Sequence, residues 1–168
     1  TPDLERRFKR IPIDIYYGYM GLRVCVSNTE QSAKLKTVNS SDDLKGITFG
    51  SGIGWSDTMK FQSAGLNVIQ DDLDRLVDKA RDGIIDCFAR GIFEPWDEHM
   101  KYLQRGITNL VINDTFAVRY PNPFYLYVNR NDGKTFKLLS EGLAKAVEDG
   151  SLEKTFKESR QYSQFDRY

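Results

Sequence analysis

A glycine-rich stretch at residues 50–56 has the residue types that could hold a small polar solute. It follows a short apolar segment and precedes a predicted helix, so it would lead from a strand into a helix N-terminus. Free backbone N–H groups and the positive end of the helix dipole favour an anionic group there, most simply a solute carboxylate. The stretch supplies five of the residues that we predict to bind a ligand: Ser51, Gly52, Gly54, Trp55 and Ser56.

More ordinary interpretations of this stretch exist. One is a plain strand-to-helix turn in which the Ser56 side chain caps the helix. Another is that Trp55 packs against the protein instead of stacking on a ligand. The stretch is not a Walker loop, because no Gly-Lys-Ser/Thr follows it, and it lacks the acidic partner of a dinucleotide fingerprint.

Three charged residues in and after the predicted strand at 84–89 could complete such a site. We expect Asp86 and Arg90 at the carboxyl end of this strand, which is where open parallel sheets place their ligands. The Arg90 guanidinium could hold a carboxylate through two hydrogen bonds, with Glu94 beside it. The alternative for Arg90 is a structural ion pair with Glu94 or Asp86.

Catalysis and metal binding find little support in the sequence. The chain has one histidine and two cysteines, Cys25 and Cys87, without a Cys-x-x-Cys pair, so no metal site and no cofactor are expected. No Ser-His-Asp or Cys-His set is visible, and an enzyme would need Glu94 or Glu98 as its general acid. The cysteines are interpreted as small buried apolar residues. A disulfide is the alternative, because both lie on predicted strands that could be neighbours.

The composition narrows the classes of partner. The 168-residue chain contains 24 Lys and Arg and 24 Asp and Glu, so its formal net charge is zero. A balanced chain gives no electrostatic basis for binding nucleic acid, whose partners carry a basic excess or face. Apolar residues make up 40%, and no run approaches the roughly 18 residues that a membrane-spanning helix requires.

The elements that would position these residues alternate between short strands and helices. Apolar, β-branched segments predict strands at 22–27, 47–50, 66–70 and 84–89, with a last strand region at 107–120 that is interrupted near Asn113. Helices of about 10–13 residues separate most of them, which is typical of βαβ units and a mainly parallel sheet. An aromatic strand at 124–130, a long amphipathic helix ending at Gly150 and a final helix follow.

The order of these pieces resembles the type 2 periplasmic solute-binding proteins, and within them the amino-acid-binding branch. The segments that carry the resemblance are DLKGITFGSG, GIID, YPNPFYLYVNRND and KLLSEGLAKAVEDGSLEKTFKE. The resemblance implies an α/β fold of the periplasmic-binding-protein type 2 kind, with one lobe plus a returning C-terminal segment. We expect an N-terminal segment and hinge at 1–21, lobe two at 22–119, and the returning strand and helices at 120–168. Most of the N-terminal half of lobe one is expected to be missing.

The same resemblance implies a function. It implies periplasmic capture of a small polar, carboxylate-bearing solute such as an amino acid, for an ABC transporter whose permease would be the partner. Tyr120 and three tyrosines at 16–19 would flank the hinge, so Tyr120 joins the predicted ligand-binding set. Amino-acid binders of this family place an aspartate that accepts the ligand ammonium where this chain has Gly91. The alternatives are the input domain of a receptor and, less favoured, a dehydratase-like enzyme.

An isolated lobe would also expose apolar surface that its other half normally covers. Exposed apolar patches mark contacts with other proteins, so we expect a homodimer or an exchange of segments between copies.

Overall fold

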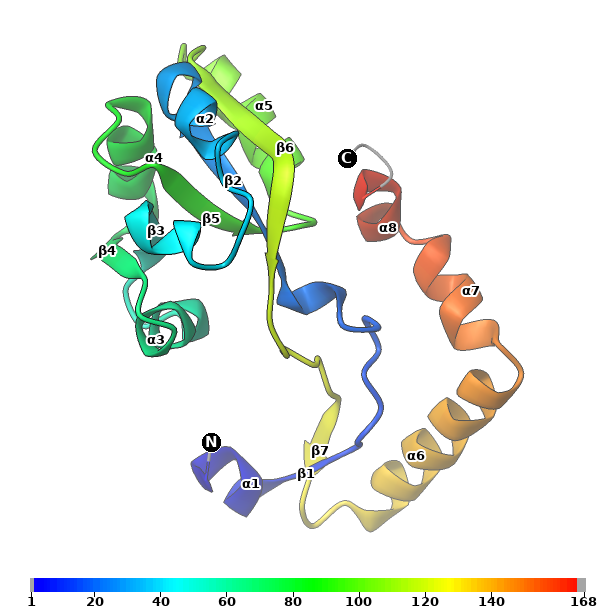
Figure 1. Cartoon of the computed structure of the whole chain (residues 1–168). Helices are drawn as coiled ribbons and strands as arrows, with labels where there is room; N and C mark the ends of the chain where they lie inside the picture. Colours follow the sequence, from blue (N-terminus) through cyan, green and yellow to red (C-terminus); the bar gives the residue numbers. More distant parts are fainter. Residues whose placement is uncertain (1, 166–168) are drawn as a thin grey trace. The chain divides into compact units, whose positions relative to one another are not determined.

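The computed structural model describes residues 2–165, which form two compact units (Figure 1). One unit is Leu22–Arg119, and the other comprises the chain up to Gly21 and from Tyr120 onward. Residue 1 and residues 166–168, the outermost parts of the predicted segments 1–21 and 120–168, lie outside the described residues. Within the described part of the chain, no helix is both long enough and apolar enough to cross a membrane.

The unit Leu22–Arg119 is built on a five-stranded mixed sheet with the order β4-β3-β5-β2-β6. Its strands are β2 (Leu22–Asn28), β3 (Thr48–Gly52), β4 (Asn67–Asp71), β5 (Cys87–Gly91) and β6 (Leu110–Arg119). β3 pairs in parallel with β4 and β5, whereas β2 pairs antiparallel with both β5 and β6. Four strands therefore run in one direction and β2 alone runs against them.

Helices connect these strands and cover both faces of the sheet. They are α2 (Thr29–Leu35), the 3-10 turn η2 (Asp43–Gly46), α3 (Ser56–Ser63), α4 (Leu73–Arg81) and α5 (Pro95–Gln104). On one face, Val26 and Phe88 pack with Leu76 of α4 and Tyr102 of α5 in the main hydrophobic core. On the other, the Phe49 ring of β3 lies 5.1 Å from that of Phe61 in α3. The period of two along each strand explains this division.

The structure shifts the limits of the predicted strands, most clearly for β3, β5 and β6. β3 continues to Gly52 instead of ending at Gly50, and β5 runs from Cys87 to Gly91, three residues later than predicted at its start. β6 is a single strand, but its pairing with β2 jumps from Cys25–Asn113 to Arg23–Val118, so the interruption predicted near Asn113 is present as an irregularity in the pairing.

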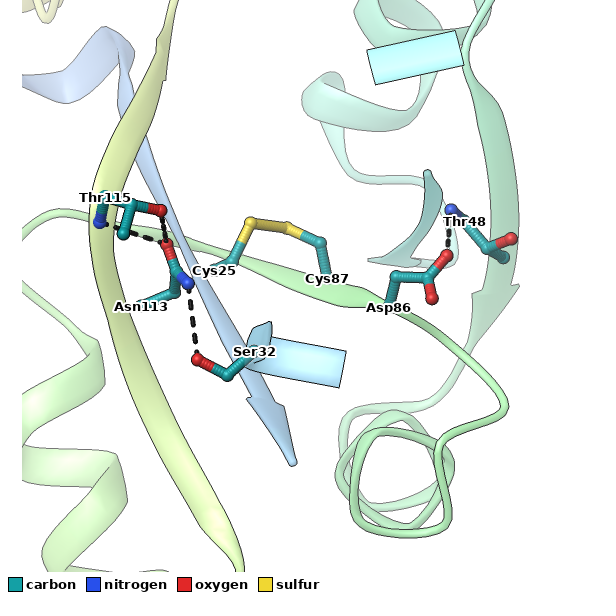
Figure 2. The surroundings of a disulfide bond; sticks show 7 residues. All are labelled: Cys25, Ser32, Thr48, Asp86, Cys87, Asn113 and Thr115. Atoms are coloured by element: carbon teal, nitrogen blue, oxygen red, sulfur yellow. Dashed lines mark hydrogen bonds between the residues drawn. A yellow bond between two sulfur atoms is a disulfide. The ribbon is translucent and has the colours of Figure 1, made fainter. Parts of the chain in front are cut away.

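Cys25 and Cys87 form a disulfide between the neighbouring strands β2 and β5. Both residues are buried, and Figure 2 shows the bond beside the Asn113 side chain, which hydrogen-bonds Thr115 and Ser32. The preferred interpretation of two unlinked cysteines is therefore wrong. The disulfide considered as the alternative is correct. The antiparallel register places Cys25 opposite Ala89, and Cys87 lies two residues before Ala89 on the same face of β5, so it is a diagonal neighbour of Cys25.

The second unit combines a two-stranded ribbon with helices and an aromatic cluster. Its elements are α1 (Pro2–Arg7), β1 (Phe8–Arg10), the 3-10 turn η1 (Tyr19–Gly21), β7 (Tyr127–Asn129), α6 (Gly133–Glu148), α7 (Ser151–Lys157) and α8 (Arg160–Phe165). β1 and β7 pair antiparallel, and β7 is shorter than the predicted strand at 124–130. Phe156 of α7 contacts the rings of Tyr16, Tyr17 and Tyr19 at 5.4–5.8 Å between centroids. Those tyrosines therefore pack within their own unit.

Candidate functional site

The strand order brings the carboxyl ends of β3 and β5 to the same sheet edge as the amino end of β2. Arg23 of β2 lies opposite Gly91 of β5, and β3 runs parallel to β5 with Gly50 paired to Phe88, so both strands end toward this edge. Five charged residues gather at this edge, and we call them the charged cluster: Arg23, Asp57, Arg90, Glu94 and Glu98. A sheet edge where strand ends converge is the usual place for a ligand in open α/β sheets.

Arg23 and Asp57 form a buried ion pair within this cluster. The Arg23 Nε donates to Asp57 Oδ2 at 2.7 Å, and Nη2 donates to Oδ1 at 3.0 Å. Both residues are less than 10% exposed, so the two hydrogen bonds must offset the cost of removing two charges from water. The sequence analysis did not include this pair in the site. A signal was present, since Arg23 interrupts an apolar strand and a buried charge requires a partner.

Arg90 is held by the carboxylates of Glu94 and Glu98 and lies over the rings of Trp55 and Phe88. Its Nε and Nη2 donate to the oxygens of Glu98 at 2.8 and 2.5 Å, and Nη2 lies 3.2 Å from Glu94 Oε2. The guanidinium carbon is 4.8 Å from the Trp55 ring centroid. Burial opposes the charged form of Arg90, but the Glu98 hydrogen bond and the two carboxylate charges outweigh it and raise the pKa. The structural ion pair considered for Arg90 is thus present, with Glu98 as the main partner and Glu94 as the second.

Burial and the neighbouring Glu98 raise the pKa of Tyr102, although Arg90 opposes this shift; the Tyr102 hydroxyl donates to Glu98 Oε2 at 3.3 Å. Burial is the larger cause and the negative charge of Glu98 adds to it. The phenol therefore stays neutral and acts as a donor, which fixes Glu98 from a second side.

The glycine-rich stretch is only partly a loop. Ser51 is fully buried on β3, where its Oγ accepts a hydrogen bond from the Thr58 hydroxyl at 2.8 Å. A Cβ at Gly52 would overlap the Trp55 indole, so this glycine leaves room for packing. Gly54 has φ +76°, a backbone conformation that suits glycine at the turn into α3.

The residues that open α3 differ from the simple capping scheme. Trp55 occupies the N-cap position and makes no side-chain capping hydrogen bond, while Ser56 is the first residue of the helix, so the interpretation of Ser56 as the cap is wrong. The Trp55 ring packs against the main hydrophobic core as well as Arg90. Ser56 is exposed beside the buried Asp57. Of the predicted loop residues, Gly54 and Ser56 therefore remain accessible to a solute.

Asp86 lies at the opposite end of β5 from Arg90, so its predicted place at the carboxyl end is wrong. It directly precedes the strand, and its Oδ2 accepts hydrogen bonds from the Thr48 N–H and the Lys34 Nζ, each at 2.8 Å (Figure 2 shows the former). The cause of the error is the strand limit, which sequence periodicity placed at 84–89.

Tyr120 belongs to the other compact unit, where its N–H donates to Gly21 O at 3.1 Å.

The arrangement is suited to binding. The arginines are fixed by carboxylates before any ligand arrives, which lowers the ordering cost of association. Glu94 is half-exposed, and α3 begins beside the same edge. Both oxygens of Glu98 already accept hydrogen bonds from Arg90, so Glu94 is the more available carboxylate.

Comparison with solved structures supports the fold. An amino-acid ABC transporter substrate-binding protein from Streptococcus pneumoniae, bound to L-arginine, matches with a TM-score of 0.57 at 13% identity over 98% of this chain and 65% of its own. An arginine transport system periplasmic binding protein from Legionella pneumophila gives 0.55 at 14% over 98% and 68%. An ancestral amino-acid-binding protein, a precursor of cyclohexadienyl dehydratase, gives 0.51 at 13% over 94% and 63%.

The chain therefore spans about two thirds of the length of these proteins. No family model matches the sequence, and no curated protein matches it either. With this chain order, mixed sheet and structural likeness, the chain has the fold of the type 2 periplasmic binding proteins.

Proposed function

We propose that this chain binds a small polar, carboxylate-bearing solute such as an amino acid and delivers it to a membrane transporter. The observation that carries the proposal is the sheet edge where β2, β3 and β5 converge. There the half-exposed Glu94, held beside Arg90, lies close to the start of α3, so an acceptor for a cation is near the backbone N–H groups of a helix N-terminus, which favour a carboxylate.

The binding residues that we propose are those of the predicted set that this edge brings together. They are Gly54, Ser56, Arg90 and Glu94, with Ser51, Gly52 and Trp55 as their support. Tyr120 stays a proposal from the other unit. The solved structures with this fold are named as proteins that bind or transport arginine or amino acids. This supports the same class of ligand for this chain.

The disulfide supports a place outside the cytoplasm. A buried Cys25–Cys87 bond forms and persists in oxidising compartments, whereas cytosolic thiols are kept reduced. This bond and the periplasmic protein among the similar structures support the proposal of a periplasmic location, with a transporter permease as the partner.

Two other functions differ in what they require. A receptor input domain would use the same site and differ in the domains attached to it. A dehydratase-like enzyme is suggested by the ancestral precursor among the related structures and would need a free acid at the edge. Glu98 is fixed by Arg90, which leaves Glu94 alone for that role.

The predicted homodimer also stays a proposal. Three apolar residues of α6 are exposed, Leu138, Leu139 and Val147, and such residues favour association. Sedimentation equilibrium across a hundredfold range of protein concentration tests it, and a constant monomer mass contradicts it.

Isothermal titration with a panel of amino acids, small peptides and organic acids tests the function. We expect saturable binding of at least one amino acid, together with a rise in Tm that grows with its concentration. The full chain is the sample, and chain unfolded in urea is the control. Absence of both heat and Tm shift across the panel would rule the proposal out.

A further inference from the structure

Two stretches of backbone join the compact units of this chain. We call them the first crossing, residues 11–21, and the second crossing, residues 120–126 (Figure 1). Both belong to the same unit, and they continue into the other unit at two junctions, Gly21–Leu22 and Arg119–Tyr120. Every movement of one unit against the other passes through both crossings. The contacts that hold the crossings together therefore decide where the chain can bend.

The Asp14 carboxylate ties the two crossings together. Its Oδ1 accepts the Tyr16 N–H at 3.0 Å and the Phe124 N–H at 3.1 Å, and its Oδ2 accepts the Gly18 N–H at 2.8 Å. Two of these amides belong to the first crossing, and the third belongs to the second crossing, 110 residues further along the chain than Asp14. Hydrogen bonds to a charged acceptor are stronger than bonds between neutral groups, so this link is a firm one.

The same carboxylate holds an uncommon backbone turn. Tyr17 has φ +52°, in the left-handed region where residues other than glycine are rare, and Gly18 follows it at φ +81°. The Tyr17 ring lies 5.6 Å from that of Phe156 between centroids, and the Gly18 amide is bonded to Asp14. Such a conformation persists only where its surroundings determine it, and such conformations gather at ligand clamps and switch regions.

Two further contacts extend the link as far as the junctions. The Asn122 Nδ2 donates to Met20 O at 2.9 Å, and the Tyr120 N–H donates to Gly21 O at 3.1 Å. A Cβ at Gly21 would lie 1.9 Å from Tyr120 O, so the absence of a side chain lets the crossings approach this closely. From Asp14 to Gly21, the two crossings therefore form one block.

The chain is also held on the far side of the junctions. There the register of β2 with β6 jumps after the pair of Cys25 with Asn113. The buried Asn113 side chain fixes this irregular part of β6, because its Oδ1 accepts the N–H and the hydroxyl of Thr115 at 3.1 and 2.7 Å. The junctions thus lie between two fixed parts of the backbone.

We propose that Asp14 is a positioning residue that makes the two crossings move as one block and so confines the bending between the units to the junctions. The inference goes beyond the proposed function, because it concerns how the units move whether or not a solute is bound. If one crossing bent without the other, more arrangements of the units would be accessible and the population of each would fall.

The first test measures amide hydrogen exchange by NMR in the full chain and in Asp14→Ala. Loss of the carboxylate should speed the exchange of its three bonded amides about 10- to 100-fold. Asp14→Asn keeps one oxygen acceptor and replaces the other by a donor, so only part of this set should exchange faster. Asp149→Ala is the matched control, because the Asp149 carboxylate accepts the Ser151 N–H within a single segment. It should leave the exchange of the crossings unchanged.

The second test measures the spread of distances between the units by double electron–electron resonance. Spin labels are attached to Gln62→Cys and Lys145→Cys, at exposed positions of α3 and α6, since both natural cysteines are in the disulfide. Asp14→Ala should broaden the distance distribution about twofold, because each crossing then bends independently. Asp149→Ala should leave it unchanged.

A glycine pair repeats this comparison without changing any charge. Gly21→Ala forces the crossings apart next to the junctions, so it should broaden the same distance distribution. Gly142→Ala is the matched control, since a Cβ at that glycine of α6 has open space around it, and it should leave the distribution as it is.

Faster exchange in Asp14→Ala with an unchanged distance distribution would overturn the inference, because Asp14 would then hold its turn without confining the movement. Unchanged exchange of the three amides would overturn it as well. Circular dichroism and Tm establish that each variant is folded, and if Asp14→Ala does not fold, Asp14→Asn decides by the same two measurements. Neither measurement uses a solute, so a failure here leaves the proposed function standing, and a chain that binds no solute leaves this inference standing.

Discussion

The Arg23 Nε lies 2.7 Å from Asp57 Oδ2, and both residues are buried where β2 begins and α3 starts. This pair joins two segments that are 34 residues apart and fixes the sheet edge on which the candidate site stands. Breaking a buried pair leaves one charge without compensation, whereas removing both charges does not.

Replacing Arg23 by Met should lower the free energy of unfolding by about 3–5 kcal/mol, because Asp57 then stays buried without its partner. The double variant Arg23→Met/Asp57→Leu should recover most of that loss. Urea unfolding of the single and double variants measures the coupling between the two sites. Additive losses in the double variant would show that the two charges do not stabilise each other.

Gly52→Ala should destabilise the protein by about 1–3 kcal/mol, because a Cβ there overlaps the Trp55 indole and forces it from the core. Trp55 fluorescence should change along with the urea midpoint. Gly46→Ala is the control, since a Cβ at that glycine has open space around it. Equal urea midpoints for Gly52→Ala and Gly46→Ala would mean that the Trp55 indole does not pack against Gly52.

Removing the disulfide with Cys25→Ala/Cys87→Ala should cost about 4 kcal/mol, the loop-closure estimate for a separation of 62 residues. A reducing agent should lower the Tm of the intact chain and leave that of the variant unchanged. If the reducing agent leaves the Tm of the intact chain unchanged, even after the chain has been reduced in the unfolded state and refolded, the disulfide is not formed.

Asp71, at the end of β4, should make stability depend on pH. The Lys79 hydrogen bond at 2.6 Å, with help from the Asp72 N–H, lowers the Asp71 pKa. Its stabilising contribution is therefore complete above the unfolded value of about 3.9 and is lost as pH falls through the lower folded pKa. Asp71→Asn should be less stable than the intact chain at pH 7, and the difference should shrink on acidification.

The matched variant for this comparison is Asp114→Asn, whose side chain is exposed on β6. It should show no such pH dependence. If the Asp71→Asn difference stays constant down to pH 2, the ion pair with Lys79 is not its cause.

The sequence was sufficient where local pattern determines structure. The amphipathic spacing of Leu73, Leu76, Val77 and Ala80 predicted α4 and its apolar face. The structure confirms the helix and buries the last three residues, whereas Leu73 in its first turn is exposed. The order of strands and helices predicted the fold, which the solved structures also support. These features depend on neighbours in sequence and on a strong apolar period.

The sequence was insufficient where partners lie far apart along the chain. Asp86 was placed at the wrong end of its strand because two apolar residues before it extend the periodic run, while the ladder starts at Cys87. The Arg90–Glu98 pair was missed because α5 turns Glu98, and not only Glu94, toward the strand. Such pairings depend on register and helix orientation, which composition and spacing do not specify.

The most direct test of solute binding at this edge is an ¹⁵N NMR titration of the full chain with L-arginine. The account predicts saturable shifts of the Gly91, Gly54 and Ser56 amide signals, while the Thr48 amide at the far end of β3 stays in place. The Gly91 signal should respond most, because its N–H is bonded to Glu94. Saturable shifts confined to amides away from these strand ends, or no shift at Gly91 at saturating L-arginine, would contradict the account.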